Sequence, residues 1–233
     1  MSDTHQKTSL IDFIPADENR LVQSFFAWYS RYKLNRVFKD VFLDLNYTPN
    51  SSRSTLYFGN HSMWWDALTP LVLNEFYLKQ RPRAVMELEQ VRKFSFFNKI
   101  GCFSINRSDP RSALKSLQYG IDWLNTSGNS LYIYPQGKLE NSANSSFVYE
   151  TGIGWMLPKL LDHVDIVPLI QHAHLMYDAK PSMFIRVGTP LNKKQIPNGK
   201  KESTLYLEEL TKSELGSLID SSSKKEITIP KMF

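Results

Sequence analysis

A histidine and an aspartate stand five residues apart in the stretch FGNHSMWWDAL, residues 58–68. A carboxylate that contacts one imidazole nitrogen fixes the tautomer and stabilises the imidazolium, which leaves the other nitrogen to accept a proton. His61 and Asp66 therefore have the residue types of a general base and the group that orients it. Such a pair removes a proton from a hydroxyl group or from water.

The spacing decides whether the two side chains can meet. On a continuous helix, residues five apart point about 140° away from each other. The geometry changes if Ser62 is the N-cap of a helix, because His61 and Asp66 then occupy positions that touch where the chain folds back over the first turn. The first N–H groups of such a helix would favour an anion. The alternative is a capped helix with a surface histidine.

The elements that must position this pair alternate between strand and helix. A short strand at 54–60 precedes a helix at 63–78, which Pro70 kinks or divides. Further strands are expected at 83–89, 102–107, 130–135, 164–170 and 182–188, and further helices at 90–101, 108–128, 152–162 and 202–219. Asp109 and Pro110 suit the first positions of the helix at 108–128. The alternation predicts a single α/β domain with a mostly parallel mixed sheet flanked by helices.

An N-terminal amphipathic helix is expected from about Glu18 to Leu45, because apolar and basic residues interleave at helical spacing. The apolar residues are Leu21, Phe25, Trp28, Tyr32 and Val37, and the basic residues are Arg20, Arg31, Lys33, Arg36 and Lys39. We therefore divide the chain into a helical segment at 1–50 and an α/β domain at 51–233. The aromatic and basic face fits a membrane interface, and it equally fits a helix packed on the domain core.

The composition narrows the class of protein. The chain has 233 residues, of which 42% are hydrophobic and 22% charged, as in ordinary globular proteins. The net charge of +5 is a mild attraction to anions, and no nucleic-acid-binding motif accompanies it. Cys102 is the single cysteine, which excludes an intrachain disulfide and a cysteine-based metal site. No signal peptide and no membrane-spanning run is evident, so a soluble or peripheral protein is expected.

Four blocks, in order, resemble those of the glycerolipid acyltransferase family, which includes lysophosphatidate and glycerol-3-phosphate acyltransferases. The first block is NHSMWWD, similar to the N-H-x-x-x-x-D motif of the family. GCFSINRSD provides Arg107, YIYPQGKLENS provides Pro135-Gln136-Gly137, and DIVPLI provides Val167-Pro168. The resemblance covers about residues 56–190, and the ordered set is far more specific than any one block.

The resemblance implies transfer of a fatty acyl group from an acyl thioester, either acyl-CoA or acyl carrier protein, to a hydroxyl group of a lipid acceptor. His61 would be the general base and Asp66 would hold it. The implied substrate-binding residues are Asn60, Arg107, Pro135, Gln136, Gly137 and Lys138. No metal and no other cofactor is implied. We expect a cytoplasmic protein at the inner face of the membrane, in peripheral contact with it.

The third block departs from the family pattern Phe-Pro-Glu-Gly-Thr-Arg-Ser. Gln136 stands where the family has a carboxylate, and Leu139 stands where it has an arginine. Lys138 is a point charge and lacks the fork with which arginine clamps a phosphate. Two kinds of acceptor follow: a phosphate-bearing lipid held between Arg107 and Lys138, or an uncharged lipid. Two other functions stay open, namely a non-catalytic lipid-binding protein and an acyl thioester hydrolase.

Three other histidines could suggest a metal site. His172 and His174 share one face of an expected strand, and His163 is near in sequence. No carboxylate or thiolate partner accompanies them, so a structural or pocket-lining role is favoured.

Overall fold

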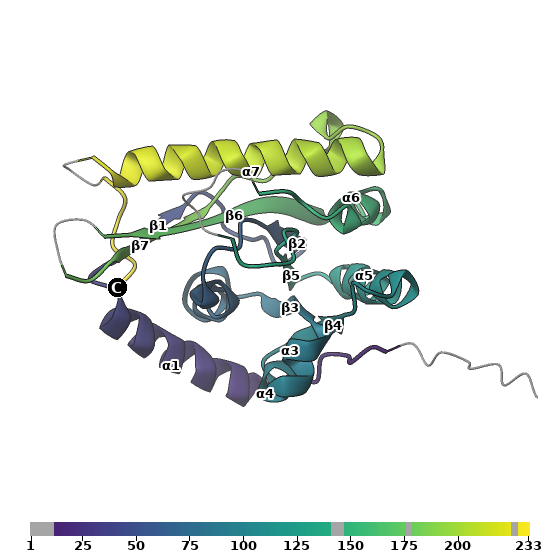
Figure 1. Ribbon diagram of the computed structural model, residues 1–233, viewed down its shortest axis with the longest axis horizontal. Coiled ribbons are helices and arrows are strands. Elements are labelled where there is room, and N and C mark those ends of the chain that lie inside the picture. The colour runs from purple at the N-terminus through teal and green to yellow at the C-terminus, as the bar shows by residue number, and fades with distance from the viewer. Residues whose placement is uncertain (1–11, 141–146, 176–178, 225–227) are drawn as a thin grey trace, which may run out of the picture.

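A twisted sheet of seven strands runs through the middle of the molecule in the part of the chain described by the computed structural model, residues 12–140, 147–175, 179–224 and 228–233 (Figure 1). The strands are β1 (Val41–Leu45), β2 (Ser54–Phe58), β3 (Arg81–Glu87), β4 (Cys102–Ile105), β5 (Asn129–Ile133), β6 (Val164–His174) and β7 (Ser182–Val187). Their order is β1-β7-β6-β2-β5-β3-β4. All neighbours are parallel except β6 and β7, which confirms the predicted mostly parallel mixed sheet.

Helices cover both faces of the sheet, as predicted. The longer ones are α1 (Arg20–Val37), α5 (Pro110–Leu124) and α7 (Lys200–Ser222). The short ones are α2 (Thr69–Leu73), α3 (Leu88–Lys93), α4 (Phe96–Lys99) and α6 (Gly152–Met156), with single turns η1 (Trp64–Ala67), η2 (Asn74–Leu78), η3 (Leu157–Lys159) and η4 (Lys193–Gln195). Figure 1 shows α7 across one face of the sheet and α1 along the other.

Two apolar layers hold these helices to the sheet. On one face, residues of α5, α6 and α7 pack against the strands, among them Leu117, Met156 and Leu207. On the other face, residues of α1 and α2 such as Leu34 and Val72 pack against Tyr57, Tyr132 and Val167. Every residue of β2 and of β5 is buried, as expected for central parallel strands covered on both faces.

The N-terminal helix is shorter than predicted. Asn19 caps α1 by accepting hydrogen bonds from the N–H groups of Leu21 and Val22, and the helix ends at Val37. The helix expected through Leu45 is therefore wrong beyond Val37, because Val41–Leu45 form strand β1. β1 pairs with β7, and Leu43 N–H donates to the Pro230 carbonyl. These tertiary pairings override the helical spacing of the sequence.

Two other expected helices are present, but each is divided into shorter helices. The helix expected at 63–78 is three short pieces, η1, α2 and η2, with Pro70 in the first turn of α2. The helix expected at 90–101 is two, α3 and α4. Asp109 caps α5 and Pro110 is its first residue, as predicted. Among the described residues, no helix combines the length and the apolar character needed to cross a membrane.

Candidate active site

The candidate residues gather where the parallel strands end. His61 follows β2, the segment 134–138 follows β5, Glu87 ends β3, and Arg107 lies two residues beyond β4. Because the carboxyl ends of parallel strands share one edge of a sheet, the topology brings these residues together, and this edge is where ligands bind in open α/β folds.

Gly59 and Asn60 fix the path of the chain as it leaves β2. A Cβ atom added to Gly59 would overlap the carbonyl oxygen of Leu169 on β6, so only glycine allows this close approach. The buried Asn60 side chain donates to the Gln171 carbonyl at 2.7 Å and accepts from the Gln171 N–H at 2.9 Å. Both ends of its amide are thus bonded to the β6 backbone, and its predicted contact with substrate stays a prediction.

His61 and Asp66 are in contact, as the sequence predicted. His61 Nδ1 lies 3.1 Å from Asp66 Oδ2, and Asp66 is fully buried while the His61 side chain is 23% exposed. The predicted cap is wrong, because Met63 rather than Ser62 precedes the first helical residue. A cap from Ser62 is unnecessary because the carboxylate of Asp66 reaches back over the turn.

Asp66 accepts hydrogen bonds from the backbone in addition to its contact with His61. Its Oδ2 accepts hydrogen bonds from the N–H groups of Ser62 at 2.7 Å and Met63 at 2.9 Å. The N–H groups of Ser62 and Met63 are therefore not available to an external anion, and anion binding by the rest of this turn stays a prediction. The second oxygen, Oδ1, is buried and has no hydrogen-bond partner among the described residues. The carboxylate is consequently held rigidly with one oxygen directed at the imidazole.

Tyr134 packs on the other side of the histidine. Its ring stacks on the His61 imidazole, with centroids 4.8 Å apart and planes 13° from parallel. The hydroxyl donates to the Asp66 carbonyl at 2.7 Å and accepts from Gln171 Nε2 at 3.1 Å. Burial, and then the charge of Asp66, raise the pKa of Tyr134 well above its usual value, so the phenol stays neutral. The stacked ring therefore limits the orientations open to the His61 imidazole.

The Pro135-Gln136-Gly137 block lies directly against His61. Gln136 Oε1 accepts the His61 N–H at 2.6 Å, and Gln136 Nε2 donates to Glu140 Oε2 at 3.1 Å. The Glu140 N–H in turn donates to the His61 carbonyl at 2.9 Å. The Pro135 carbonyl accepts the N–H of Glu150 at 2.8 Å. The amide that stands in place of the carboxylate thus fixes the backbone of His61, and the block contacts His61 through the main chain.

The two expected phosphate-binding cations are near the block, and each is paired with a carboxylate. Arg107 Nε donates to Glu87 Oε2 at 2.6 Å. A Cβ atom added to Gly137, whose φ is +67°, would overlap the Arg107 guanidinium, so the two are in close contact. Lys138 Nζ lies 2.8 Å from Glu140 Oε1. Binding of substrate by either cation stays a prediction.

Sequence reasoning missed four partners of the site. Glu87 and Gln171 were not considered, and Tyr134 and Glu140 were noted only as parts of a block. Glu87 could have been found, because a carboxylate at the end of an expected parallel strand lies at the binding edge. Gln171 contacts the site only through the pairing of β6 with β2, which the sequence does not reveal.

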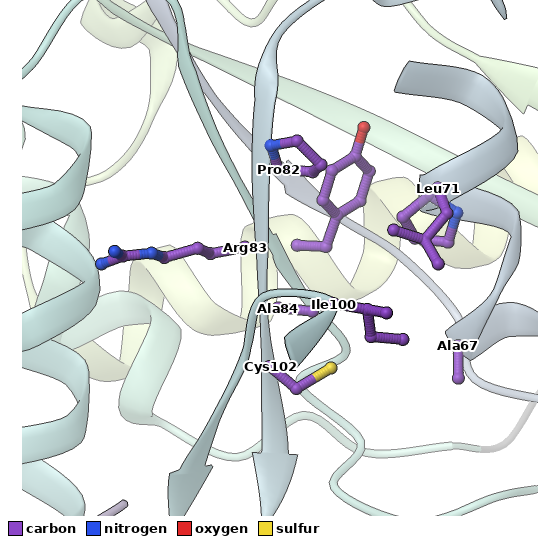
Figure 2. Close-up of a pocket in the computed structure, with 9 residues that line it drawn as sticks. Ala67, Leu71, Pro82, Arg83, Ala84, Ile100 and Cys102 are labelled. Atoms are coloured by element: carbon purple, nitrogen blue, oxygen red, sulfur yellow. The ribbon is translucent and has the colours of Figure 1, made fainter. Parts of the chain in front are cut away.

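A small cavity lies next to Ala67, between α2 and the strands β3, β4 and β5. It holds about 10 Å³, room for roughly one water molecule. Its lining is mostly apolar, and the Arg83 guanidinium points away from it (Figure 2). The lining residues are Ala67, Pro70, Leu71, Pro82, Arg83, Ala84, Ile100, Cys102 and Tyr132. Burial raises the pKa of the Cys102 thiol to about 12, so it is a buried strand residue and no nucleophile.

The remaining histidines do not form a metal centre in the described part of the chain. His174 Nδ1 lies 2.9 Å from His172 Nε2, and His163 Nε2 lies 3.2 Å from the Leu124 carbonyl. Burial, with a smaller effect of His174, lowers the pKa of His172 to about 4. Within the described residues, no group of three potential ligands could hold a metal ion.

Comparisons with known proteins agree with this architecture. A family model described as Acyltransferase matches residues 43–171, which include all of the predicted site residues. The solved structure of the 1-acyl-sn-glycerophosphate (LPA) acyltransferase PlsC from Thermotoga maritima is similar, with a TM-score of 0.55 and 14% sequence identity. The match covers 84% of this chain and 79% of that one, and at this identity it shows a shared fold. No curated protein matches the sequence.

Proposed function

Because the chain belongs to the acyltransferase family, we propose that it transfers a fatty acyl group from an acyl thioester to a hydroxyl group of a lipid, with His61 as the general base. The observation that carries the proposal is the contact of His61 Nδ1 with the fully buried Asp66 carboxylate at 3.1 Å. It lies at the carboxyl edge of the sheet, where ligands bind in open α/β folds, and within residues 43–171 that the family model matches.

The proposed reaction needs a base that accepts one proton and later returns it. With Nδ1 donating to Asp66, Nε2 of His61 accepts the proton of the acceptor hydroxyl as its oxygen attacks the thioester carbonyl. The tetrahedral intermediate collapses, the C–S bond breaks, and the thiolate receives the proton. One C–O bond replaces one C–S bond. The thioester is already activated, so the proposal includes no metal and no redox cofactor.

Asp66, Tyr134 and Gln136 support this role by holding His61 from three directions. Asp66 fixes the tautomer, Tyr134 stacks on the ring, and Gln136 accepts the backbone N–H. A base positioned in this way contributes on the order of 10²- to 10⁴-fold to the rate. A protein that only bound lipid would have no use for an oriented base, which disfavours the binding-protein alternative.

We also propose that α1 contacts the membrane surface from which the acceptor is drawn, at the cytoplasmic face. Large apolar side chains of α1 are exposed to solvent, with Leu21 at 81%, Phe25 at 65% and Trp28 at 58%. Arg31 and Lys33 lie over aromatic rings of the same helix, an arrangement that suits a membrane interface. The measurement is sedimentation with neutral and anionic liposomes. Absence of binding to either kind would remove this part of the proposal.

An aromatic series connects the buried residue that follows α1 to the site. Phe38, which follows α1, packs against Trp65 with centroids 6.0 Å apart, and Trp65 packs against Trp64 at 5.4 Å. Trp64 is 55% exposed and lies two residues from Asp66. A membrane that contacts α1 and Trp64 would therefore lie beside the proposed base.

The test of the enzymatic proposal is release of free thiol from acyl-CoA and from acyl carrier protein donors, with and without lipid acceptors. We expect acceptor-dependent release by the wild type and its loss in His61→Ala. His163→Ala is the matched control, because His163 contacts the Leu124 carbonyl and no residue of the site. Release that needs no acceptor would identify a thioester hydrolase. Absence of thiol release from both donors would favour the lipid-binding alternative.

A further inference from the structure

The charges beside His61 cancel. Arg107 is bonded to Glu87 at 2.6 Å and Lys138 to Glu140 at 2.8 Å, so the two expected phosphate ligands and their partners sum to zero. A phosphomonoester carries a charge of about −1.5 to −2 at neutral pH and is bound strongly by cationic groups that no carboxylate already neutralises. The four residues offer none.

Glu140 is built into the site. Its N–H donates to the His61 carbonyl, its Oε2 accepts from Gln136, and its Oε1 is paired with Lys138. These partners, Lys138 first and Gln136 second, lower the pKa of the Glu140 carboxyl, so it stays ionised at neutral pH. A carboxylate is thus anchored beside the proposed base, and it would repel an anionic headgroup there.

The fork of Arg107 is also engaged. Nε donates to Glu87, and Nη1 is the atom that an added Cβ at Gly137 would meet first. A bidentate phosphate contact through Nε would have to displace Glu87, and any contact through the other nitrogens would be made by a cation whose charge Glu87 already offsets. Leu139, 52% exposed, stands where the family has a second arginine, and the sequence has no lysine or arginine between Lys138 and Lys159. No further cation of this loop can replace it.

Resting on the proposed function, we propose that the acceptor is an uncharged hydroxylated lipid, such as an acylglycerol or a glycosylated lipid. Glu87 and Glu140 disfavour acceptors that carry a phosphomonoester next to the reacting hydroxyl. Each ion pair is partly exposed and contributes little by itself. The discrimination comes from the two carboxylates, because each offsets the charge of the cation that would otherwise attract a phosphate.

The experiment compares kcat/KM of the wild type for three acceptors with the same acyl chain: monoacylglycerol, a glycosylated monoacylglycerol and lysophosphatidate. All are presented at equal mole fraction in neutral detergent micelles. We expect at least one uncharged acceptor to exceed lysophosphatidate by about tenfold or more. Acceptor-dependent activity that is highest with lysophosphatidate would overturn this inference and leave the proposed function intact. Activity with no acceptor would defeat the proposed function itself.

Charge-removing variants test which groups set the preference. We expect Glu87→Gln and Glu140→Gln each to shift the kcat/KM ratio toward lysophosphatidate about tenfold, and the double variant further. Glu89→Gln is the matched control, because Glu89 forms a similar pair with Arg92 at 3.2 Å outside the site. Its ratio should equal that of the wild type. Folded variants with an unchanged ratio would overturn the assignment to Glu87 and Glu140.

Discussion

The two sides of His61 are built differently. On the side of Asp66 and Tyr134, the contacts are made by a buried and a partly buried side chain, they involve backbone groups, and they join the segments that follow β2 and β5 to β6. On the side of Arg107 and Lys138, the contacts are ion pairs between side chains that are 26–68% exposed. A change on the first side disturbs the fold and the base together, while the second side can change charge at little cost in stability. The proposed chemistry therefore depends on the rigid side, and acceptor choice on the adjustable one.

The largest effect is expected from Asp66→Ala. It removes the partner of His61 and leaves the N–H groups of Ser62 and Met63 without an acceptor. Each lost partner costs about 1–3 kcal/mol, and the rate should fall about 10²- to 10⁴-fold. Urea unfolding and thiol release measure the two quantities. Asp122→Ala removes an exposed carboxylate and should change neither; an equally mild Asp66→Ala would contradict the rigid-side account.

Gly59→Ala should act mainly on the backbone path. The added Cβ overlaps the Leu169 carbonyl, so β2 or β6 must shift, at about 1–3 kcal/mol. The shift displaces His61, and activity should fall with stability. Gly216→Ala is the control, because nothing lies within 4 Å of its added Cβ and α7 should gain about 0.5–1 kcal/mol. Thermal unfolding and thiol release are measured for both variants. A Gly59→Ala variant as stable and as active as the wild type would contradict the claim that only glycine fits here.

Tyr134→Phe should separate orientation of the base from stability. The variant keeps the ring stacked on His61 and loses the hydroxyl bonds to Asp66 and Gln171, at about 1–2 kcal/mol. Activity should fall several-fold, because the ring still orients the imidazole. Tyr149→Phe loses a similarly buried hydroxyl bond, to Thr211, away from the site. Tyr149→Phe should lose stability and keep its activity. An equal loss of activity in both variants would mean that Tyr134 has no orienting role.

Much of the architecture could be predicted because local patterns and tertiary packing agree. The strands β2 and β5 each end in three consecutive apolar or aromatic residues, Leu56–Phe58 and Leu131–Ile133, and α5 has Asp109 and Pro110 at its start. β1 was missed because its residues continue the helical spacing of α1, and only its pairing with β7 makes it a strand. The spacing of apolar residues within one segment does not show which distant segment it will pair with.

In the site, the contact of His61 with Asp66 could be predicted from their spacing. The residues that hold this pair in place could not be predicted. A serine hydroxyl is a preferred N-cap, so Ser62 was the natural choice. The carboxylate of Asp66 instead takes the two N–H groups that a cap would serve. The bonds of Asn60 with Gln171 join residues 111 positions apart in sequence. The pairing of each cation with a carboxylate depends on loop geometry and changes the expected acceptor chemistry.

The smallest effect on stability is expected on the adjustable side. Lys138→Ala removes one partner of an ion pair whose lysine is 68% exposed, so the free energy of unfolding should change by less than about 0.5 kcal/mol. The kcat/KM ratio should nonetheless move further from lysophosphatidate, because Glu140 then lacks its counter-charge. Lys138→Met keeps the aliphatic stem and should give the same ratio, which attributes the effect to charge. If thermal unfolding instead showed a loss as large as that of Tyr134→Phe, this loop would be part of the rigid frame, and acceptor choice could not vary independently of the base.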